Sequence, residues 1–431
     1  MKLAPGHPLS IALQIDTEGP LRPIGRLAWA EGVAQLEWSP EAISAGLPIS
    51  PLHYPLEPGL HPARSRAFDG LHGFLADSLP DAWGTLLLRR QLQKLGASLK
   101  DLNPVDRLAL VGWRGRGALV FEPETLPDKN SSTIDLDQLA AESQNVLRGE
   151  DGELDELFAR LGGGSGGARP KVHVAFADNG SIRAGDTPAG HWPAGSGPVG
   201  SGTGEWIVKF PALIDPPDIG PIEEAYARMA RGAGVTIGET RLIASAVGQR
   251  AGGGGHFATR RFDRPSPSQR LHMISLGGAM EASPHMPSLD YDGFLRATLS
   301  ITRDMRDVEQ AFRRMVFNVL AHNRDDHVRQ HAYLMDIRGE WHLAPAFDLT
   351  FAHGPGGEHY MAVMGEGRHV TGVHVAALGA RHGIAKAAVV RIIDEVRSAI
   401  ARWPQIAEEV GVQHSAREIG ERLAVVAAQF A

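Results

Sequence analysis

The feature that most constrains this chain is a short polar segment enclosed by apolar sequence. Residues 322–331, HNRDDHVRQH, follow the apolar run VFNVL and precede the apolar residues YLM. Titratable groups this dense, with core-like flanks on both sides, predict a polar loop held on a rigid scaffold. A solvated loop is the plainer alternative. A metal site built from His322, His327 and His331 is another, although no H-E-x-x-H or comparable ligand spacing supports it.

Two further ionisable residues lie inside apolar runs. Asp348 stands in LAPAFDLTF, where an acid is either paired or holds a metal. Lys209 stands in WIVKF on a predicted strand, where an ammonium group is costly unless an anion meets it. A lysine at a strand edge that reaches water is the alternative. The predicted helix that follows supplies Glu223 and Glu224, which makes a Lys–Glu pair geometrically plausible.

A glycine-rich run precedes the lysine. Gly162, Gly164 and Gly167 fit G-x-G-x-x-G, a backbone able to approach phosphate closely, while a flexible hinge is the alternative. No Gly-Lys-Ser/Thr closes the run, so it is not a Walker loop. A glycine loop, a strand lysine, a helix glutamate, an Arg-Asp loop and an apolar-flanked Asp follow the order of a protein-kinase site.

The composition indicates the general class of protein but says little about any reaction that the protein catalyses. With 431 residues, 43% hydrophobic and 22% charged, the chain is expected to be globular and to have two or three domains. With a net charge of −7, the chain is not expected to have the strongly basic surface of a protein that binds DNA without a partner. Contact with DNA would need a local basic patch or a partner protein. The chain has no cysteine, signal-like N-terminus or long apolar run, and we expect a cytoplasmic protein without membrane contact.

Periodicity divides the chain into a β-rich opening, a mixed middle and a mainly helical end. Alternating residues predict a small antiparallel sheet within residues 8–60. Further strands are predicted at 111–123, 172–176, 205–211, 241–247 and 256–262. Helices are predicted at 81–95, within 134–161, and at 222–233, 308–322, 386–402 and 416–430. Residues 179–205, rich in Gly, Pro and Ser, predict a long hairpin loop.

Several short motifs are distributed along the chain: GGARPK at 166–171, WIVKFP at 206–211, RRFDR at 260–264, NRDDH at 323–327 and PAFDLTF at 345–351, with FLADSLPDAWG and GRGALVFEP in the first domain. Together they resemble the motifs of HipA-type serine/threonine kinases. The resemblance covers nearly the whole chain. It implies an α+β, two-lobed protein-kinase-like fold with a small N-terminal β-rich accessory domain and a mostly helical C-terminal lobe. The implied domains are 1–130, 131–265 and 266–431.

The resemblance also implies roles for individual residues. Asp325 would be the catalytic base and Asp348 a metal ligand, with Gln330 beside it. Glu224 would support Lys209, the phosphate-contacting lysine. The remaining nucleotide-binding residues would be Gly166, Gly167, Ala168, Arg169, Pro170 and Lys171 over the phosphates, Arg260, Arg261 and Phe262 at the adenine hinge, and His327, Gln330 and Phe347.

Two positions depart from the family pattern. Gln330 stands where the family usually has Asn, as a ligand of a second Mg²⁺. Gly164 stands at the position of a loop serine that family members autophosphorylate, and Ser165, one place away, is the candidate for that modification. The first departure favours an alternative to an active enzyme, a weakened pseudokinase that binds an antitoxin/DNA complex.

The function implied by the resemblance is phosphorylation of protein serine or threonine with ATP and Mg²⁺. Family members commonly act as toxins of toxin–antitoxin systems. The implied target is a translation-related protein such as an aminoacyl-tRNA synthetase. The implied partner is a helix-turn-helix antitoxin of HipB type, through which DNA is contacted indirectly. A metal-dependent hydrolase built on the three histidines is a third hypothesis.

Overall fold

The computed structural model describes residues 7–125, 134–150, 169–176, 182–185, 204–245 and 254–430. The chain forms two compact units, each assembled from separate stretches of sequence. The first comprises Met1–Leu213, Arg260–Glu281 and Leu334–Trp341, and the second Ile214–Thr259, Ala282–Tyr333 and His342–Ala431. The three-domain division at residues 130 and 265 stays a prediction.

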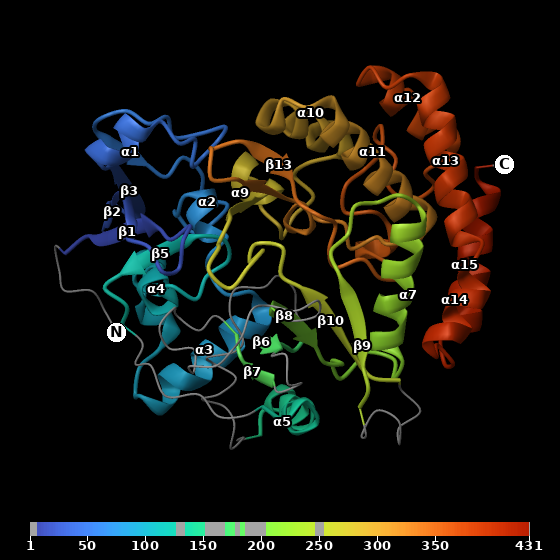
Figure 1. Ribbon diagram of the computed structural model, residues 1–431, viewed down its shortest axis with the longest axis horizontal. Helices are drawn as coiled ribbons and strands as arrows, with labels where there is room; N and C mark the ends of the chain where they lie inside the picture. The colour runs from blue at the N-terminus through green and yellow to red at the C-terminus, as the bar shows by residue number, and fades with distance from the viewer. Residues whose placement is uncertain are drawn as a thin grey trace. The chain divides into compact units, whose positions relative to one another are not determined.

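The first unit opens with the expected antiparallel sheet (Figure 1). Its strand order is β4-β3-β2-β1-β5. The strands are β1 (Leu9–Leu13), β2 (Arg22–Ala30), β3 (Val33–Trp38), β4 (Leu60–Pro62) and β5 (Leu119–Glu122). On β3 alternate side chains are buried, namely Ala34, Leu36 and Trp38, as expected for a strand with one face against a core.

Short helices complete this part of the unit. They are α1 (Pro40–Ala45), α2 (Gly73–Ala76), α3 (Ala82–Lys94), η1 (Leu99–Asp101), α4 (Pro104–Val111) and α5 (Leu136–Arg148). Helix α3 begins where the sequence predicts, because the Asp81 side chain accepts a hydrogen bond from the Gly84 amide at 2.7 Å and caps the helix.

A second antiparallel group in the first unit has the order β7-β6-β8. It comprises β6 (Lys171–Phe176), β7 (Ile182–Ala184) and β8 (Gly204–Lys209), and β11 (His272–Ser275) and α9 (Leu276–Met280) follow later in the chain. The register sets Lys171 opposite Lys209, so these two side chains share one face of the sheet. Val172 and Val174 face the opposite side and are fully buried.

An arginine cluster joins two distant parts of the first unit. The Asp263 carboxylate accepts hydrogen bonds from Arg261 (2.8 Å), Arg264 (2.9 Å) and the Gly117 amide (2.9 Å). Arg264 and Arg270 also donate to carbonyl oxygens of residues 113–117. Gly117 has φ +67°, and a Cβ there would lie 2.7 Å from the Met273 amide nitrogen. Only glycine fits this close approach.

The second unit is mainly helical. Its helices are α7 (Ile219–Gly232), α10 (Tyr291–Thr302), α11 (Met305–Leu320), η2 (Val328–Gln330), η3 (Pro355–Gly357), α12 (Gly372–Arg381), α13 (Lys386–Ile400), α14 (Trp403–Val410) and α15 (Ala416–Ala428). Antiparallel strands β9 (Thr240–Ile243) and β10 (His256–Arg260) follow α7. The strands β12 (Ala332–Met335) and β13 (Trp341–Leu343) each contain a boundary between the two units along the sequence, because Leu334–Trp341 is assigned to the first unit.

Helix α11 is the centre of the second unit. Every side chain from Ala311 to Leu320 is buried, as expected of a helix covered on all sides. Helices α10, α13 and α15 pack against it, and α13 and α14 also pack against α7 (Figure 1). At the end of α11 the Ala321 carbonyl accepts a hydrogen bond from Tyr226 at 2.7 Å. The polar segment predicted from the sequence therefore leaves a firmly held helix end.

The predicted elements are largely confirmed, with shifted ends. The helix predicted at 308–322 is α11, which begins at Met305 and ends at Leu320. The strand predicted over 111–123 is wrong in its first half, because α4 reaches Val111 and the strand is confined to Leu119–Glu122. The strand predicted to end at Phe262 ends at Arg260, because the next residue turns into the arginine cluster.

Among the described residues, no helix combines the length and hydropathy needed to cross a membrane.

We expect Asp263→Asn to lower the free energy of unfolding by about 3–5 kcal/mol, because it leaves the buried Arg261 and Arg264 without their counter-charge. Chemical denaturation measures the change. Glu37→Gln is the matched control, since Glu37 pairs with Arg26 at the exposed surface, where an ion pair contributes less than about 1 kcal/mol. Equal losses in the two variants would contradict the role given to the cluster.

Candidate active site

The polar segment at the end of α11 is folded back onto the segment that carries Asp348. His322 adopts a left-handed conformation (φ +53°), and its Nδ1 lies 3.1 Å from the Ala352 carbonyl oxygen. Its ring stacks on Phe351 with centroids 5.2 Å apart. The Arg324 amide donates to the same Ala352 carbonyl at 3.2 Å. The loop is therefore held on a scaffold, as the sequence predicted.

The two adjacent carboxylates of this loop have opposite environments. The Asp325 side chain is 54% exposed, whereas that of Asp326 is fully buried. The Nε2 atom of His327 lies 4.0 Å from Asp325 Oδ1. Of the two acids, Asp325 is thus the one that a dissolved substrate can reach.

A backbone hydrogen bond selects one tautomer of the neutral His327 ring. Burial lowers its pKa, and the charge of Asp348 acts in the opposite direction. Its Nδ1 accepts a hydrogen bond from the Arg329 amide at 3.2 Å and caps η2. The proton of the neutral ring is therefore on Nε2, the atom nearest Asp325. His327 can donate one hydrogen bond into the space beside that carboxylate.

Asp348 and Gln330 meet within the second unit. Gln330 Nε2 donates to Asp348 Oδ2 at 2.9 Å, although the two residues are 18 positions apart. Asp348 has φ +58°, a conformation that Asp tolerates better than most residues, and it is half-buried. Carboxylate and amide oxygens are the ligands that Mg²⁺ takes in proteins, so the pair fits the expected ion. Gln330 would have to turn its amide to present the oxygen.

The histidines do not assemble a metal site of their own. The His331 ring is buried against Phe294, with centroids 4.2 Å apart, and His322 is committed to Ala352 and Phe351. Among the residues that the structure describes, none of the three histidines belongs to a group of three or more potential ligands. The geometry therefore gives no support to the hydrolase hypothesis.

The predicted phosphate-binding residues that can be described lie in the first unit. Lys209 is 9% exposed on β8. Lys171, opposite it, places its ammonium 3.1 Å from the buried carboxylate of Asp81. Pro170 is buried, and its carbonyl accepts a hydrogen bond from the Phe210 amide at 2.8 Å. Arg169, half-buried, precedes it, and the predictions for Gly162, Gly164, Ser165, Gly166, Gly167 and Ala168 lie outside the described residues.

The predicted adenine hinge overlaps the arginine cluster. Arg261 is buried, pairs with Asp263, and lies 3.1 Å from His173 Nδ1 through its Nη1 atom. Its amide donates to the Glu205 carbonyl at 2.8 Å. Arg260 and Phe262 on either side are half-buried. The Arg261 side chain thus has a structural task, and the nucleotide-binding role of these three residues stays a prediction.

The predicted helper of Lys209 is engaged within the second unit. Glu224 accepts hydrogen bonds from Arg228 Nε and Thr240 Oγ1, both at 2.8 Å. Its neighbour Glu223 is more deeply buried, at 2% exposure. Phe347, beside Asp348, is half-buried. The roles of Glu224 and Phe347 stay predictions.

The structure adds residues that the sequence did not single out. Asp326 accepts hydrogen bonds from Tyr291 Oη (2.6 Å), His359 Nδ1 (2.8 Å) and the Tyr360 amide (2.7 Å). No motif connects these four positions along the chain. The only signal was the second acid of NRDDH, which is identical in type to the first.

Two family models match the chain. The HipA N-terminal domain matches residues 9–122, and the HipA-like C-terminal domain matches residues 163–403. No curated protein matches the sequence.

Solved structures give a fold comparison. HipA of Shewanella oneidensis MR-1, determined with HipB and its operator DNA, is 17% identical, with a TM-score of 0.68 over 97% of this chain and 95% of that one. The proinflammatory kinase CtkA of Helicobacter pylori is 12% identical, with a TM-score of 0.36 over 53% of this chain and 88% of that one. The first likeness shows the fold and confirms the expected α+β class.

Stability is expected to fall as His322 is protonated. Burial, followed by the positive charge of Arg324, lowers the pKa of His322 to about 4. The pKa of His322 is near 6.5 in the unfolded chain and about 4 in the folded one, so between these two pH values the unfolded state binds a proton more readily than the native state. The full stability is therefore present above pH 6.5, and it decreases as the pH falls from 6.5 toward 4. Relative to His322→Asn, the wild-type free energy of unfolding should decline by up to about 1.4 kcal/mol per pH unit there. Parallel pH profiles would contradict this assignment.

Proposed function

Because the chain belongs to the HipA family, we propose that it is an ATP-dependent serine/threonine protein kinase. The observation that carries the proposal is the grouping in the second unit. An exposed carboxylate, Asp325, lies 4.0 Å from His327 Nε2. The Asp348–Gln330 pair belongs to the same unit, and the charge of Asp348 acts to raise the pKa of His327.

In the proposed reaction Asp325 orients the substrate hydroxyl and accepts its proton. His327 Nε2, beside it, donates a hydrogen bond to a phosphate oxygen. Phosphoryl transfer needs little covalent help from the protein, so positioning and charge neutralisation supply most of the rate. Asp348 and Gln330 would hold Mg²⁺, which when bound neutralises charge on the transferred phosphoryl group. Lys209 would contact the phosphates.

The wider role is part of the same proposal. The chain would be the toxin of a toxin–antitoxin pair, acting on a translation-related protein such as an aminoacyl-tRNA synthetase. Its partner would be a helix-turn-helix antitoxin of HipB type, with DNA contacted through that partner. The net charge of −7 is consistent with indirect DNA contact.

A weakened pseudokinase is the second candidate. The observation that favours it is the amide hydrogen bond between Gln330 and Asp348, which occupies an oxygen that an ion would need. A chain that binds ATP without transferring phosphate would fit this candidate. Its role would then be to bind an antitoxin/DNA complex.

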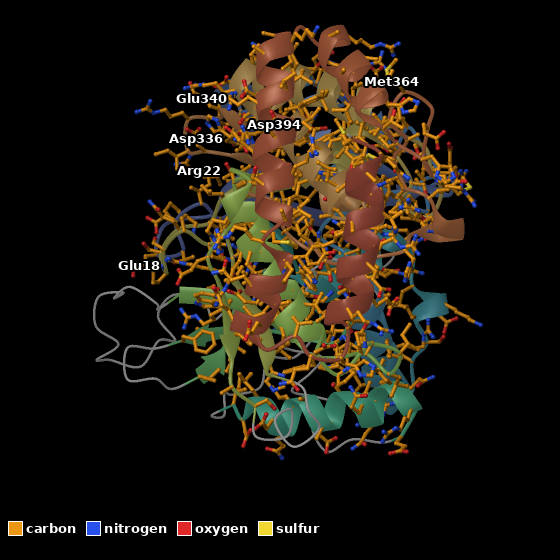
Figure 2. The ribbon with its side chains drawn as sticks, turned by 90° about the vertical axis from the view of Figure 1, so that its right-hand side faces the viewer. Glu18, Arg22, Asp336, Glu340, Met364 and Asp394 are labelled. Atoms are coloured by element: carbon orange, nitrogen blue, oxygen red, sulfur yellow. The ribbon has the colours of Figure 1, made fainter. Side chains whose placement is uncertain are left out.

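Asp325→Asn should reduce phosphate transfer from radiolabelled ATP by about 100-fold or more, because the amide cannot accept the hydroxyl proton. Asp394→Asn is the matched control, since Asp394 is an exposed acid on α13 of the same unit (Figure 2). The control should retain wild-type transfer. Equal transfer by Asp325→Asn and wild type would contradict the assignment of the base.

Gln330→Glu tests the metal site without reference to activity. A second carboxylate beside Asp348 repels it in the absence of an ion and provides a harder ligand in its presence. We expect a lower melting temperature without Mg²⁺ and a larger Mg²⁺-dependent gain than in wild type, measured by thermal shift with nucleotide absent. A loss that Mg²⁺ does not restore would indicate that Gln330 is only a structural donor to Asp348.

A further inference from the structure

The residues on both sides of Asp325 hold one and the same loop. Arg324 donates hydrogen bonds from its guanidinium to the carbonyl oxygens of Gly357 and Arg368, the second at 2.8 Å. Asp326 accepts from His359 and from the Tyr360 amide. We call residues 354–368 the 354–368 loop. Asp325 therefore stands between two residues that are both fastened to it.

The Asp326 carboxylate is a buried, charged junction. Its side chain has no exposed surface, and its two oxygens accept three hydrogen bonds of 2.6–2.8 Å. Burial alone raises the pKa of Asp326, but its electrostatic interaction with His359 and the hydrogen bonds from His359, Tyr291 and Tyr360 outweigh burial and keep the pKa below its usual value. Hydrogen bonds to an ionised, buried acceptor are among the strong ones in proteins.

A second layer of contacts fixes the donors. Tyr291, the first residue of α10, accepts a hydrogen bond from Asn318 of α11 at 3.0 Å, and Asn318 accepts one from Asn323 at 3.0 Å. The Tyr291 amide also donates to the Ala362 carbonyl at 3.0 Å. Two core helices and the 354–368 loop thus converge on the residue after Asp325.

The loop itself is closed by local contacts. Arg368 pairs with Glu358 at 3.0 Å and donates to the Gly356 carbonyl at 2.9 Å. The turn marked by Met364 in Figure 2 is closed by hydrogen bonds between Val363 and Glu366. The loop is therefore compact. Because it is hydrogen-bonded to both Arg324 and Asp326, the position of Asp325 between them depends on the position of the loop.

We propose that Asp326 is a positioning residue that locks the 354–368 loop and the segment carrying Asp325 into one arrangement, so that the reach of Asp325 toward a hydroxyl substrate depends on that loop. This inference rests on the proposed kinase function. The backbone of Asp325 cannot rotate freely while its neighbours are anchored on either side. Displacement of a reacting group by about 1 Å can cost on the order of 100-fold in rate.

The test compares Asp326→Asn with Asp218→Asn in the full-length chain. Asp218 is the matched control because it is also fully buried in the second unit and accepts three hydrogen bonds, from the Gln413 amide and from the amide and hydroxyl of Ser415. Both variants replace a buried carboxylate that accepts three hydrogen bonds with an amide. Only Asp326→Asn disturbs the attachment of the 354–368 loop.

Two readouts are measured. With nucleotide absent, hydrogen–deuterium exchange of residues 354–368 should be faster in Asp326→Asn than in wild type and in Asp218→Asn. In phosphate transfer, Asp326→Asn should lower kcat by about 10–100-fold while KM for ATP changes by less than about twofold. Asp218→Asn should keep the wild-type kcat. Tyr291→Phe, which removes one donor to Asp326, provides a milder variant and should lower kcat less.

The outcomes separate the two claims. Exchange in residues 354–368 that is no faster in Asp326→Asn than in Asp218→Asn would overturn the anchoring role, whatever the activity. If exchange quickens but kcat matches that of the control, the dependence of Asp325 on the loop is overturned. A wild-type chain that transfers no phosphate would overturn the proposed function, while the exchange experiment would still decide whether Asp326 anchors the loop. Should Asp326→Asn fail to fold, Tyr291→Phe decides both points.

Discussion

A buried carboxylate must have its hydrogen-bonding capacity filled, and this chain meets that requirement by joining segments that are far apart in sequence. Asp77 accepts hydrogen bonds from the amide and hydroxyl of Ser275, and Asp218 accepts from the amide and hydroxyl of Ser415. Asp81 pairs with Lys171, and Asp263 with two arginines. A buried charge is weak evidence for net stability, yet removing its partner is costly. These contacts therefore fix which segments meet.

The sequence predicted the elements whose signal is local and missed the contacts that are not. Apolar spacing located α13 and α15 because one face of each is buried, and it located α3, whose predicted start coincides with the Asp81 cap seen in the structure. The motif RRFDR was interpreted as a nucleotide hinge. Nothing in its composition shows that Arg261 and Arg264 pair with Asp263, or that Arg264 donates a hydrogen bond to a carbonyl within residues 113–117. The hydrogen bond joins positions almost 150 residues apart in the sequence.

The candidate site shows the same division. Gln330 and Asp348 were expected beside each other only through the family resemblance, and the structure brings their side chains to 2.9 Å. Their roles as ligands stay predictions. Asp325 and Asp326 are identical in type and adjacent, so the family resemblance singled out Asp325, whereas composition and spacing could not show which of the two acids is buried. Burial depends on what folds over the second acid, which is the distant segment of His359 and Tyr360.

The two adjacent acids together meet two requirements of a catalytic base, exposure to the substrate and a fixed position, that one residue could not meet alone. A base must be open to its substrate, and the 54% exposure of Asp325 satisfies this condition. It must also be fixed in place, which calls for strong contacts in a region of low dielectric. Asp326 provides such contacts because its charge is directed to three donors inside the protein. An apolar residue at position 326 would leave those donors buried and unsatisfied, so the position requires an acceptor even though it need not touch a substrate.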